Sequence, residues 1–224
     1  MKKGKIIVVE GTDGSGKNTQ VNLLRENLEK KYEKVRSISF PYYDSPSSGL
    51  IKMYLEGEFG TDAMAVSPYV ASTFYAADRY AAYKTDFGEF YRQGGILIAD
   101  RYVSSNMLHQ ASKIDNFEER KKFLDWLYDL EYHIYQIPEP DQVFFLNMPL
   151  EYSSQLLSHR AKKFDTKKDD IHESNQAYMK KSYQTACELC KECGWEEIHC
   201  VKNGAIRTIE DIQQELENKV EKLL

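Results

Sequence analysis

The chain has 224 residues, of which 42% are hydrophobic and 29% charged, a composition typical of one globular domain with its own core. Its 30 basic and 35 acidic residues give a formal net charge of −5, which argues against a general nucleic-acid binder. No apolar run approaches the roughly 20 residues of a membrane span, and the run at residues 6–9 is shorter than the about 7–15 apolar residues of a signal peptide. These features predict a cytoplasmic protein with no nucleic-acid or membrane partner.

Apolar runs along the chain predict strands that alternate with helices. The expected strands cover residues 5–10, 35–40, 95–100, 142–148 and 196–201. Most of these runs are continuously apolar, as expected when both faces of a parallel sheet are covered. The expected helices cover residues 17–31, 47–56, 67–92, 117–135, 150–160, 174–193 and 207–222. The alternation predicts an α/β fold with a five-stranded parallel sheet flanked by helices in three layers, and no linker divides residues 1–224 into two domains.

The first strand and helix are joined by a glycine-rich turn, EGTDGSGKNTQ, at residues 10–20. Strand, turn and helix in this order are the context of a phosphate-binding loop of the type G-x-x-x-x-G-K-[ST], which predicts a P-loop NTPase fold. Backbone N–H groups of such a turn form a nest for anions, and the start of the helix adds its positive end. Lys17 would add a point charge for the β- and γ-phosphates. The alternative is a glycine-rich turn without a ligand. The residues expected to bind the nucleotide are Gly11, Thr12, Asp13, Gly14, Ser15, Gly16, Lys17, Asn18 and Thr19.

Two positions bear on a metal ion. The third expected strand ends in Asp100, the position from which P-loop proteins direct a carboxylate toward Mg²⁺ or its water shell. The loop motif usually has Ser or Thr directly after its lysine, but this chain has Asn18, and the hydroxyl follows at Thr19. An amide oxygen is also a hard neutral ligand, and Mg²⁺ keeps several waters in such sites. We therefore expect Asn18 to weaken metal binding rather than abolish it.

Five motifs stand out along the chain: the loop at residues 10–20, FP at 40–41, FYAADR at 74–79, DRYVSS at 100–105 and IPEPD at 137–141. Together they resemble the motifs of the thymidylate kinase family, which transfers the γ-phosphoryl group of ATP to dTMP. The likeness runs in register over nearly the whole chain. It implies ATP and Mg²⁺ as cofactors, a deoxynucleoside monophosphate as the acceptor substrate and a homodimeric assembly.

The resemblance implies roles for individual residues. Arg101 would clamp the acceptor phosphate, because a guanidinium can bind two oxygens and stabilise the charge during transfer. Phe74 would stack on the base, and Arg79 would donate to a base carbonyl. Asp13 would lie near the acceptor phosphate and help to position the metal with Asp100 and Asn18. The other residues assigned to the acceptor site are Phe40, Pro41, Leu55, Ser105, Gln110, His172 and Tyr178.

Residues 159–173, HRAKKFDTKKDDIHE, form a charged segment that we expect to be irregular and that matches the lid of the family. Some members of the family carry an arginine in the phosphate loop where this chain has Gly14. Members with glycine there take the catalytic positive charge from the lid. We therefore expect Arg160 to join Lys17, Asp13 and Arg101 as a catalytic residue.

The acceptor site departs from the family pattern at several positions. The segment FPYYDSPSSG, residues 40–49, has no arginine for the acceptor phosphate. The expected lid ends in DIHE, so that Ile171 and His172 replace a frequent arginine and aromatic residue and leave the preference for deoxyribose open. His109 and Ala111 replace a frequent tyrosine and glycine beside Gln110.

Alternative functions remain open at this point. The same chemistry could act on another acceptor, such as dUMP or a purine deoxynucleotide, because stacking tolerates any base. The chain could instead be a nucleotide-binding regulator in which Asn18 blocks turnover. A P-loop protein that acts on nucleic acid is disfavoured by the acidic charge balance.

Four cysteines lie near the C-terminus, and Cys187, Cys190 and Cys193 have the spacing C-x2-C-x2-C of some metal and iron–sulfur sites. The segment around them is expected to be helical, which spreads the three thiols over neighbouring faces. Cys200 also lacks the ending of the iron–sulfur pattern. We therefore expect reduced thiols in an intracellular protein.

Overall fold

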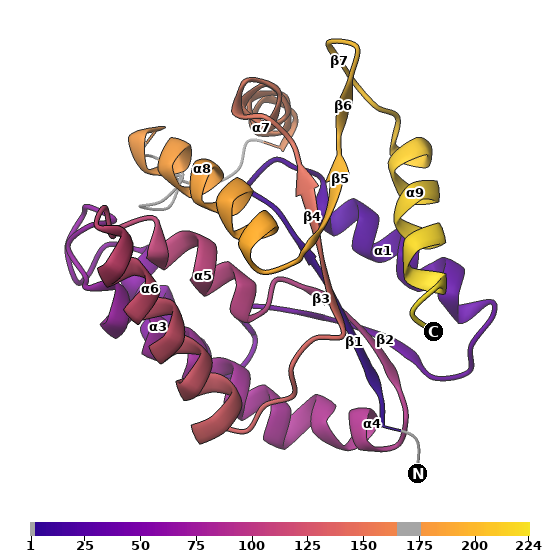
Figure 1. Cartoon of the computed structure of the whole chain (residues 1–224), viewed down its shortest axis with the longest axis horizontal. Helices are drawn as coiled ribbons and strands as arrows, with labels where there is room; N and C mark the ends of the chain where they lie inside the picture. Colours follow the sequence, from indigo (N-terminus) through magenta and orange to yellow (C-terminus); the bar gives the residue numbers. More distant parts are fainter. Residues whose placement is uncertain (1–2, 165–175) are drawn as a thin grey trace.

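The computed structural model describes residues 3–164 and 176–224, and side chains for these except 158–164. Its centre is a five-stranded parallel sheet with the strand order β2-β3-β1-β4-β5 (Figure 1). The predicted α/β fold with a five-stranded parallel sheet is confirmed. The division into a single domain over residues 1–224 stays a prediction. The strands of the sheet are β1 (Lys5–Glu10), β2 (Val35–Ser39), β3 (Ile96–Asp100), β4 (Gln142–Asn147) and β5 (Glu196–His199).

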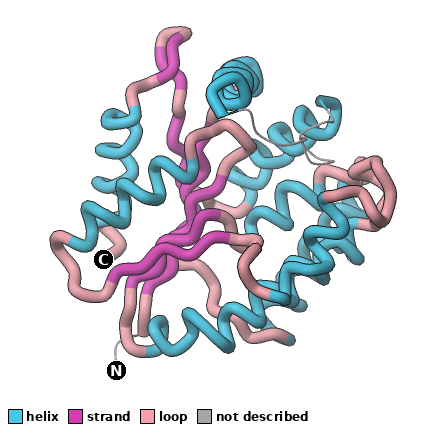
Figure 2. The backbone as a smooth tube through the Cα atoms, turned by 180° about the vertical axis from the view of Figure 1, so that it is seen from behind, coloured by secondary structure: helices cyan, strands magenta, loops and turns pink. Residues whose placement is uncertain are grey.

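Helices connect the strands and cover both faces of the sheet (Figure 2). Among the described helices, none combines the length and the apolar character that a membrane crossing requires. The α-helices are α1 (Lys17–Glu29), α2 (Gly49–Leu55), α3 (Pro68–Ala82), α4 (Gly88–Arg92), α5 (Val103–Ala111), α6 (Phe117–Tyr128), α7 (Leu150–Phe164), α8 (Gln176–Glu192) and α9 (Ile209–Glu221). The remaining elements are the 3₁₀ turn η1 (Pro46–Ser48), the π-helical segments η2 (Tyr83–Phe87) and η3 (Asp129–Ile134), and the hairpin of β6 (Val201–Lys202) and β7 (Ala205–Ile206).

The central strands are buried on both faces, which explains their continuously apolar sequences. In β1, Ile6 and Val8 join a core cluster with residues of η2, α5 and α6. Ile7 and Val9 point to the opposite face and join a second cluster with residues of α1 and α9. Because a core cluster covers each face of β1, the polar residues that follow this strand lie at the carboxyl edge of the sheet.

Local signals in the sequence mark several helix starts. Asn116 caps α6 by accepting a hydrogen bond from the Glu119 N–H at 3.0 Å. Thr208 caps α9 by accepting from the Asp211 N–H at 3.1 Å. Pro68 is the first residue of α3, where its missing N–H leaves no helical hydrogen bond unmade.

Several expectations about the elements are corrected. The expected helix at residues 67–92 is divided into α3 and α4 by the π-helical η2, and η3 likewise ends the helix expected at 117–135. α7 continues to Phe164, so the backbone at residues 159–164 is helical rather than irregular, consistent with a stretch that contains no glycine or proline. Helix α5 was not expected, and its buried face mixes polar residues with apolar ones.

The cysteines near the C-terminus are free thiols in different surroundings. Cys190 and Cys200 are buried, Cys187 is half-buried and Cys193 is exposed. Within the described ranges, no group of three or more His, Cys, Asp or Glu side chains could hold a metal ion.

Lys113, two residues after the end of α5, is a buried cation outside the phosphate loop. Its Nζ donates to the Tyr54 hydroxyl at 2.8 Å and to the Val66 carbonyl at 3.3 Å, and it lies 5.3 Å from the centre of the Tyr54 ring. Burial lowers the pKa of Lys113 to about 8, and Asp62 offsets only part of this effect. Lys113 therefore ties α5 to α2 and to the loop before α3.

The pKa of Lys113 makes stability depend on pH in a defined direction. The unfolded chain keeps its Lys113 proton up to the ordinary pKa of about 10.5, whereas the folded chain loses it near pH 8. Between these values the unfolded state binds more protons, so stability rises with pH by up to about 1.4 kcal/mol per pH unit. We expect the free energy of unfolding of the wild type, minus that of Lys113→Met, to be constant below about pH 7 and to increase from pH 8 to 10 in urea titrations. A difference that stays constant up to pH 10 would contradict the assignment.

Candidate active site

The phosphate loop follows β1 at the carboxyl edge of the sheet. Gly14 and Gly16 have φ angles of +79° and +88°, which residues with a Cβ rarely adopt. A Cβ on Gly14 would also lie 2.7 Å from the Ser153 carbonyl oxygen and 2.9 Å from Leu157 Cγ of α7. The loop is thus packed against α7, and this backbone does not accept the arginine that the resemblance places here in some family members.

Lys17, the first residue of α1, is held over the loop. Its Nζ donates to the carbonyls of Gly11 at 2.6 Å and Thr12 at 3.0 Å and lies 4.0 Å from the Asp13 carboxylate. Burial lowers the pKa of Lys17, and Arg101 acts in the same direction against the nearby carboxylates. The buried hydroxyls of Thr12 and Ser15 have no hydrogen-bond partner among the described residues. The first turn of α1 carries no acidic residue, which leaves its positive end available to an anion.

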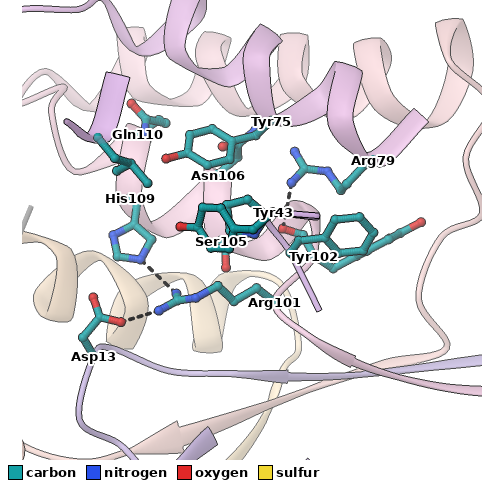
Figure 3. A pocket seen from close by; sticks show the side chains of 13 residues that line it. Asp13, Tyr43, Tyr75, Arg79, Arg101, Tyr102, Ser105, Asn106, His109 and Gln110 are labelled. Atoms are coloured by element: carbon teal, nitrogen blue, oxygen red, sulfur yellow. Dashed lines mark hydrogen bonds and ion pairs between the residues drawn. The ribbon is translucent and has the colours of Figure 1, made fainter. Parts of the chain in front are cut away.

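Arg101 connects β3 with the phosphate loop. Its backbone is left-handed, with φ of +69°, an uncommon conformation for a residue with a side chain. Its guanidinium pairs with Asp13 and lies 3.2 Å from His109 Nε2 (Figure 3). It is also 3.8 Å from Glu10. Burial alone would lower the pKa of Arg101, but these carboxylates and Asp100 outweigh it and raise the pKa. The side chain is therefore a permanent cation at the junction of loop and cavity.

Glu10 is a site residue that the sequence analysis missed. Its side chain is fully buried and accepts hydrogen bonds from the Gly11 N–H, Ser104 Oγ and Ser105 Oγ at 2.7–2.9 Å. A carboxylate at the end of a buried strand, immediately before the loop glycine, was the available signal. Glu10 fixes the start of the loop to the first turn of α5.

A cavity of about 200 Å³ opens beside Arg101, between the segment that follows β2 and the helices α2, α3 and α5 (Figure 3). A larger cavity of about 380 Å³ lies on the other side of α5, but the phosphate loop contributes nothing to it. Of the residues assigned to the acceptor site, those that line the smaller cavity are Phe40, Pro41, Leu55, Arg79, Arg101, Ser105 and Gln110. Its other lining residues are Asp13, Tyr43, Tyr75, Tyr102, Asn106 and His109.

Arg79 and Gln110 line the cavity on the side away from Asp13 (Figure 3). Arg79 is almost fully buried there, and its guanidinium pairs with the fully buried Glu131. The side-chain amide of Gln110 is buried, and neither its oxygen nor its nitrogen has a hydrogen-bond partner within the described part of the chain. Buried polar atoms are nearly always paired, so Gln110 is suited to a polar ligand such as a base edge.

The placement of Phe74 corrects the sequence analysis. Phe74 does not line the cavity and instead contacts Phe59, with ring centres 5.8 Å apart. Its neighbour Tyr75 lines the cavity with Arg79. Residues four apart lie on the same face of an α-helix, whereas residues five apart do not. The spacing to Arg79 was therefore the signal that favours Tyr75 as the aromatic residue facing the base end.

Tyr178 of α8 and His109 of α5 lie next to each other beside the phosphate loop. The two side chains stack with ring centres 6.2 Å apart, and the Tyr178 hydroxyl donates to the His109 carbonyl at 3.0 Å. Tyr178 lines a small neighbouring cavity with Thr12 and Asp13 rather than the main one. Its assignment to the acceptor site stays a prediction.

The residues assigned to the metal differ in their surroundings. One carboxylate oxygen of Asp100 is buried and has no hydrogen-bond partner among the described side chains and backbone. An unpaired buried carboxylate oxygen suits a hard cation such as Mg²⁺ or a water bound to it. Asn18 is exposed, and its amide oxygen accepts a hydrogen bond from Asn22 at 3.2 Å, which a metal would have to replace.

Two assigned residues belong to the lid segment. The backbone of Arg160 is part of α7, but its side chain lies outside the described residues, as does the whole of His172. The roles of both stay predictions.

Comparisons with known proteins agree on one family. A family model described as thymidylate kinase matches residues 9–205. The thymidylate kinase of Mycobacterium tuberculosis is 28% identical over 191 residues, which cover 85% of this chain and 87% of the relative. The thymidylate kinase of Plasmodium falciparum is 27% identical over 222 residues, covering 99% and 92%. The probable thymidylate kinase of Thermococcus kodakarensis is 30% identical over 214 residues, covering 92% and 97%.

The fold also matches a solved structure. A thymidylate kinase from Candida albicans superimposes with a TM-score of 0.73 and a sequence identity of 24%, covering 98% of this chain and 92% of the other. At this identity the likeness supports the fold.

The two left-handed glycines of the loop give a matched test of its packing. Each substitution by alanine imposes backbone strain of about 1–2 kcal/mol. Gly14→Ala also brings a Cβ against α7, whereas no atom lies within 4 Å of a Cβ at Gly16. We therefore expect Gly14→Ala to lower the free energy of unfolding more than Gly16→Ala, by at least about 1 kcal/mol, in urea titrations without nucleotide. Equal losses would show that α7 does not restrain the loop.

Proposed function

The chain belongs to the thymidylate kinase family, and we propose that it transfers the γ-phosphoryl group of ATP to dTMP, giving ADP and dTDP, at the site around Arg101. The observation that carries this assignment is the pairing of Arg101 with Asp13. One guanidinium thereby stands between the phosphate loop and the cavity, where the phosphates of a donor and an acceptor would meet.

The donor, ATP, would bind at the phosphate loop and Lys17. Backbone N–H groups of the turn and the start of α1 would receive the phosphates of ATP. The Lys17 ammonium, which bonds to the loop carbonyls of Gly11 and Thr12, would turn to the β- and γ-phosphates. The unpaired hydroxyls of Thr12 and Ser15 offer further hydrogen bonds to them.

The acceptor, dTMP, would bind in the cavity beside Arg101. Arg101 would exchange part of its contact with Asp13 for the phosphate of dTMP, holding the acceptor oxygen in line with the γ-phosphorus. It would also stabilise the charge on the oxygens during transfer. Tyr43, which lines the cavity near Arg101 on a segment without arginine, can donate a hydrogen bond to the same phosphate.

The base of the acceptor would lie at the far end of the cavity. In this proposal Arg79 donates to a base carbonyl, Gln110 bonds to the base edge and Tyr75 packs against the ring. The solved Candida albicans enzyme is described as having broad substrate specificity. A purine deoxynucleotide is therefore the competing acceptor to test.

Asp100 fits Mg²⁺ by its unpaired oxygen, and Asp13 lies on the same edge of the sheet. We propose that these two carboxylates, with Asn18 as a weaker partner, hold the ion directly or through water. When bound, the ion would neutralise charge on the β- and γ-phosphates.

Other features of the proposal follow from the resemblance. We propose a homodimer that acts in the cytoplasm in nucleotide biosynthesis, with Arg160 supplying a catalytic positive charge. Free thiols support a reducing compartment. Exposed aromatic residues on α3 and α6, Tyr69, Tyr80, Phe117 and Tyr128, offer a surface for the second subunit.

A coupled assay of ADP release tests the function directly. With ATP, Mg²⁺ and a panel of dTMP, dUMP, dCMP, dGMP and ribothymidine monophosphate, we expect the highest kcat/KM for dTMP. Arg101→Ala should lower that value by at least about 100-fold, because a charge that would stabilise the transition state is lost. Arg25→Ala is the matched control, since Arg25 pairs with Glu29 on the exposed side of α1.

Two results would contradict the proposal. Flat traces over the whole panel, with ATP bound, would favour a nucleotide-binding regulator in which Asn18 prevents turnover. A higher kcat/KM for dGMP or dUMP would replace dTMP as the acceptor.

A further inference from the structure

Glu131 is a buried carboxylate that the transfer chemistry does not use. It lies in η3, beyond the end of α6, and its side chain is 0% exposed. One of its oxygens accepts from Arg79 Nε at 2.9 Å, and the other accepts from Arg79 Nη2. Two parallel hydrogen bonds of this kind fix both the position and the plane of a guanidinium.

The hydrogen bonds of Arg79 account for part of its donors. A guanidinium has five N–H groups, of which Glu131 takes one on Nε and one on Nη2. The Tyr102 carbonyl accepts from Nη1 at 3.4 Å. The remaining donors lie on Nη1 and Nη2, the edge away from Nε. Arg79 itself lines the acceptor cavity (Figure 3). By holding Nε and Nη2, Glu131 determines which edge of the guanidinium faces a ligand.

The energetics of the pair point to positioning rather than stability. Removing two charges from water costs so much that a buried ion pair is often no more stable than apolar side chains of the same size. Despite the cost of burial, the Glu131 carboxylate raises the pKa of Arg79 and keeps it charged. An arginine alone in this place would be an uncompensated buried charge without a fixed orientation. Glu131 therefore gives the cavity a charged donor in one orientation.

We propose that Glu131 is a positioning residue for recognition of the acceptor base. Through Arg79 it holds N–H donors at the base end of the cavity, which favours a base with a carbonyl oxygen at that edge over one with an amino group. A donor facing an amino group would leave both groups without an acceptor, which is costly in a buried site. The inference rests on the proposed function and adds the residue that sets its selectivity for dTMP over dCMP.

Kinetics of the full chain with two acceptors test this role. For Glu131→Gln we expect the KM for dTMP to rise about tenfold, while the KM for ATP changes less than about twofold. The ratio of kcat/KM for dTMP over dCMP should fall by about tenfold, because Gln carries no charge and turns an amino group toward Nη2. Asp129→Asn is the matched control, since the exposed Asp129 lies in the same η3 and pairs with His133 rather than with Arg79.

A double-variant cycle separates positioning from folding. In an Arg79→Gln background, Glu131→Gln should leave the ratio of dTMP to dCMP unchanged, because Glu131 acts only through Arg79. If Glu131→Gln alone does not fold, Glu131→Asp keeps the buried charge balance but is too short to hold both guanidinium nitrogens in place. It should show the same rise in KM and the same loss of selectivity.

The outcomes distinguish the inference from the function it rests on. A lower melting temperature with an unchanged KM for dTMP and an unchanged ratio would reduce Glu131 to a structural role and overturn the inference. A loss of selectivity that persists in the Arg79→Gln background would also overturn it. Failure of the wild type to phosphorylate dTMP, with folded protein, would instead contradict the proposed function.

Discussion

The ion pair between Arg101 and Asp13 is the contact on which the rest of the site depends. It joins the end of β3 to the phosphate loop after β1, two neighbouring strands of the parallel sheet. Since carboxyl ends of parallel strands share one edge, the sheet brings these charges together without long connections. Glu10 fixes the loop to α5, and the left-handed backbone of Arg101 turns its side chain toward the loop. Donor and acceptor phosphates would thus share one guanidinium.

The cations of the site and the core differ in the carboxylates that lie beside them. Lys17 and Arg101 share the carboxylates of Glu10, Asp13 and Asp100, which keeps both cations at the edge of the sheet. Arg79, deeper in the cavity, has a carboxylate of its own in Glu131. Among the described residues no ion pair joins Lys113 to a carboxylate, and burial lowers its pKa. The cations that line the cavity are those whose charge is secured by a nearby acid.

The sequence predicted the sheet, the phosphate loop and most of the cavity, because strands buried on both faces and glycine-rich turns leave strong local patterns. It did not predict the features that depend on tertiary contacts. Helix α5 buries Ser104, Asn106 and Gln110 beside its apolar residues, so polar and apolar side chains share its inner face. Glu10 and Glu131 become functional only through partners far away in sequence. The choice of Phe74 over Tyr75 was an error of helical spacing that the sequence itself could have corrected.

Binding of a bisubstrate analogue tests the central claim most directly. In this compound adenosine and thymidine are joined through their 5′ positions by five phosphates, so that one molecule spans the loop and the cavity. If the two sites meet at Arg101, linkage makes the second contact intramolecular, and calorimetry should give a Kd at least about 100-fold below that of ATP or dTMP alone. A Kd no lower than that of ATP would show that the two nucleotides do not bind end to end.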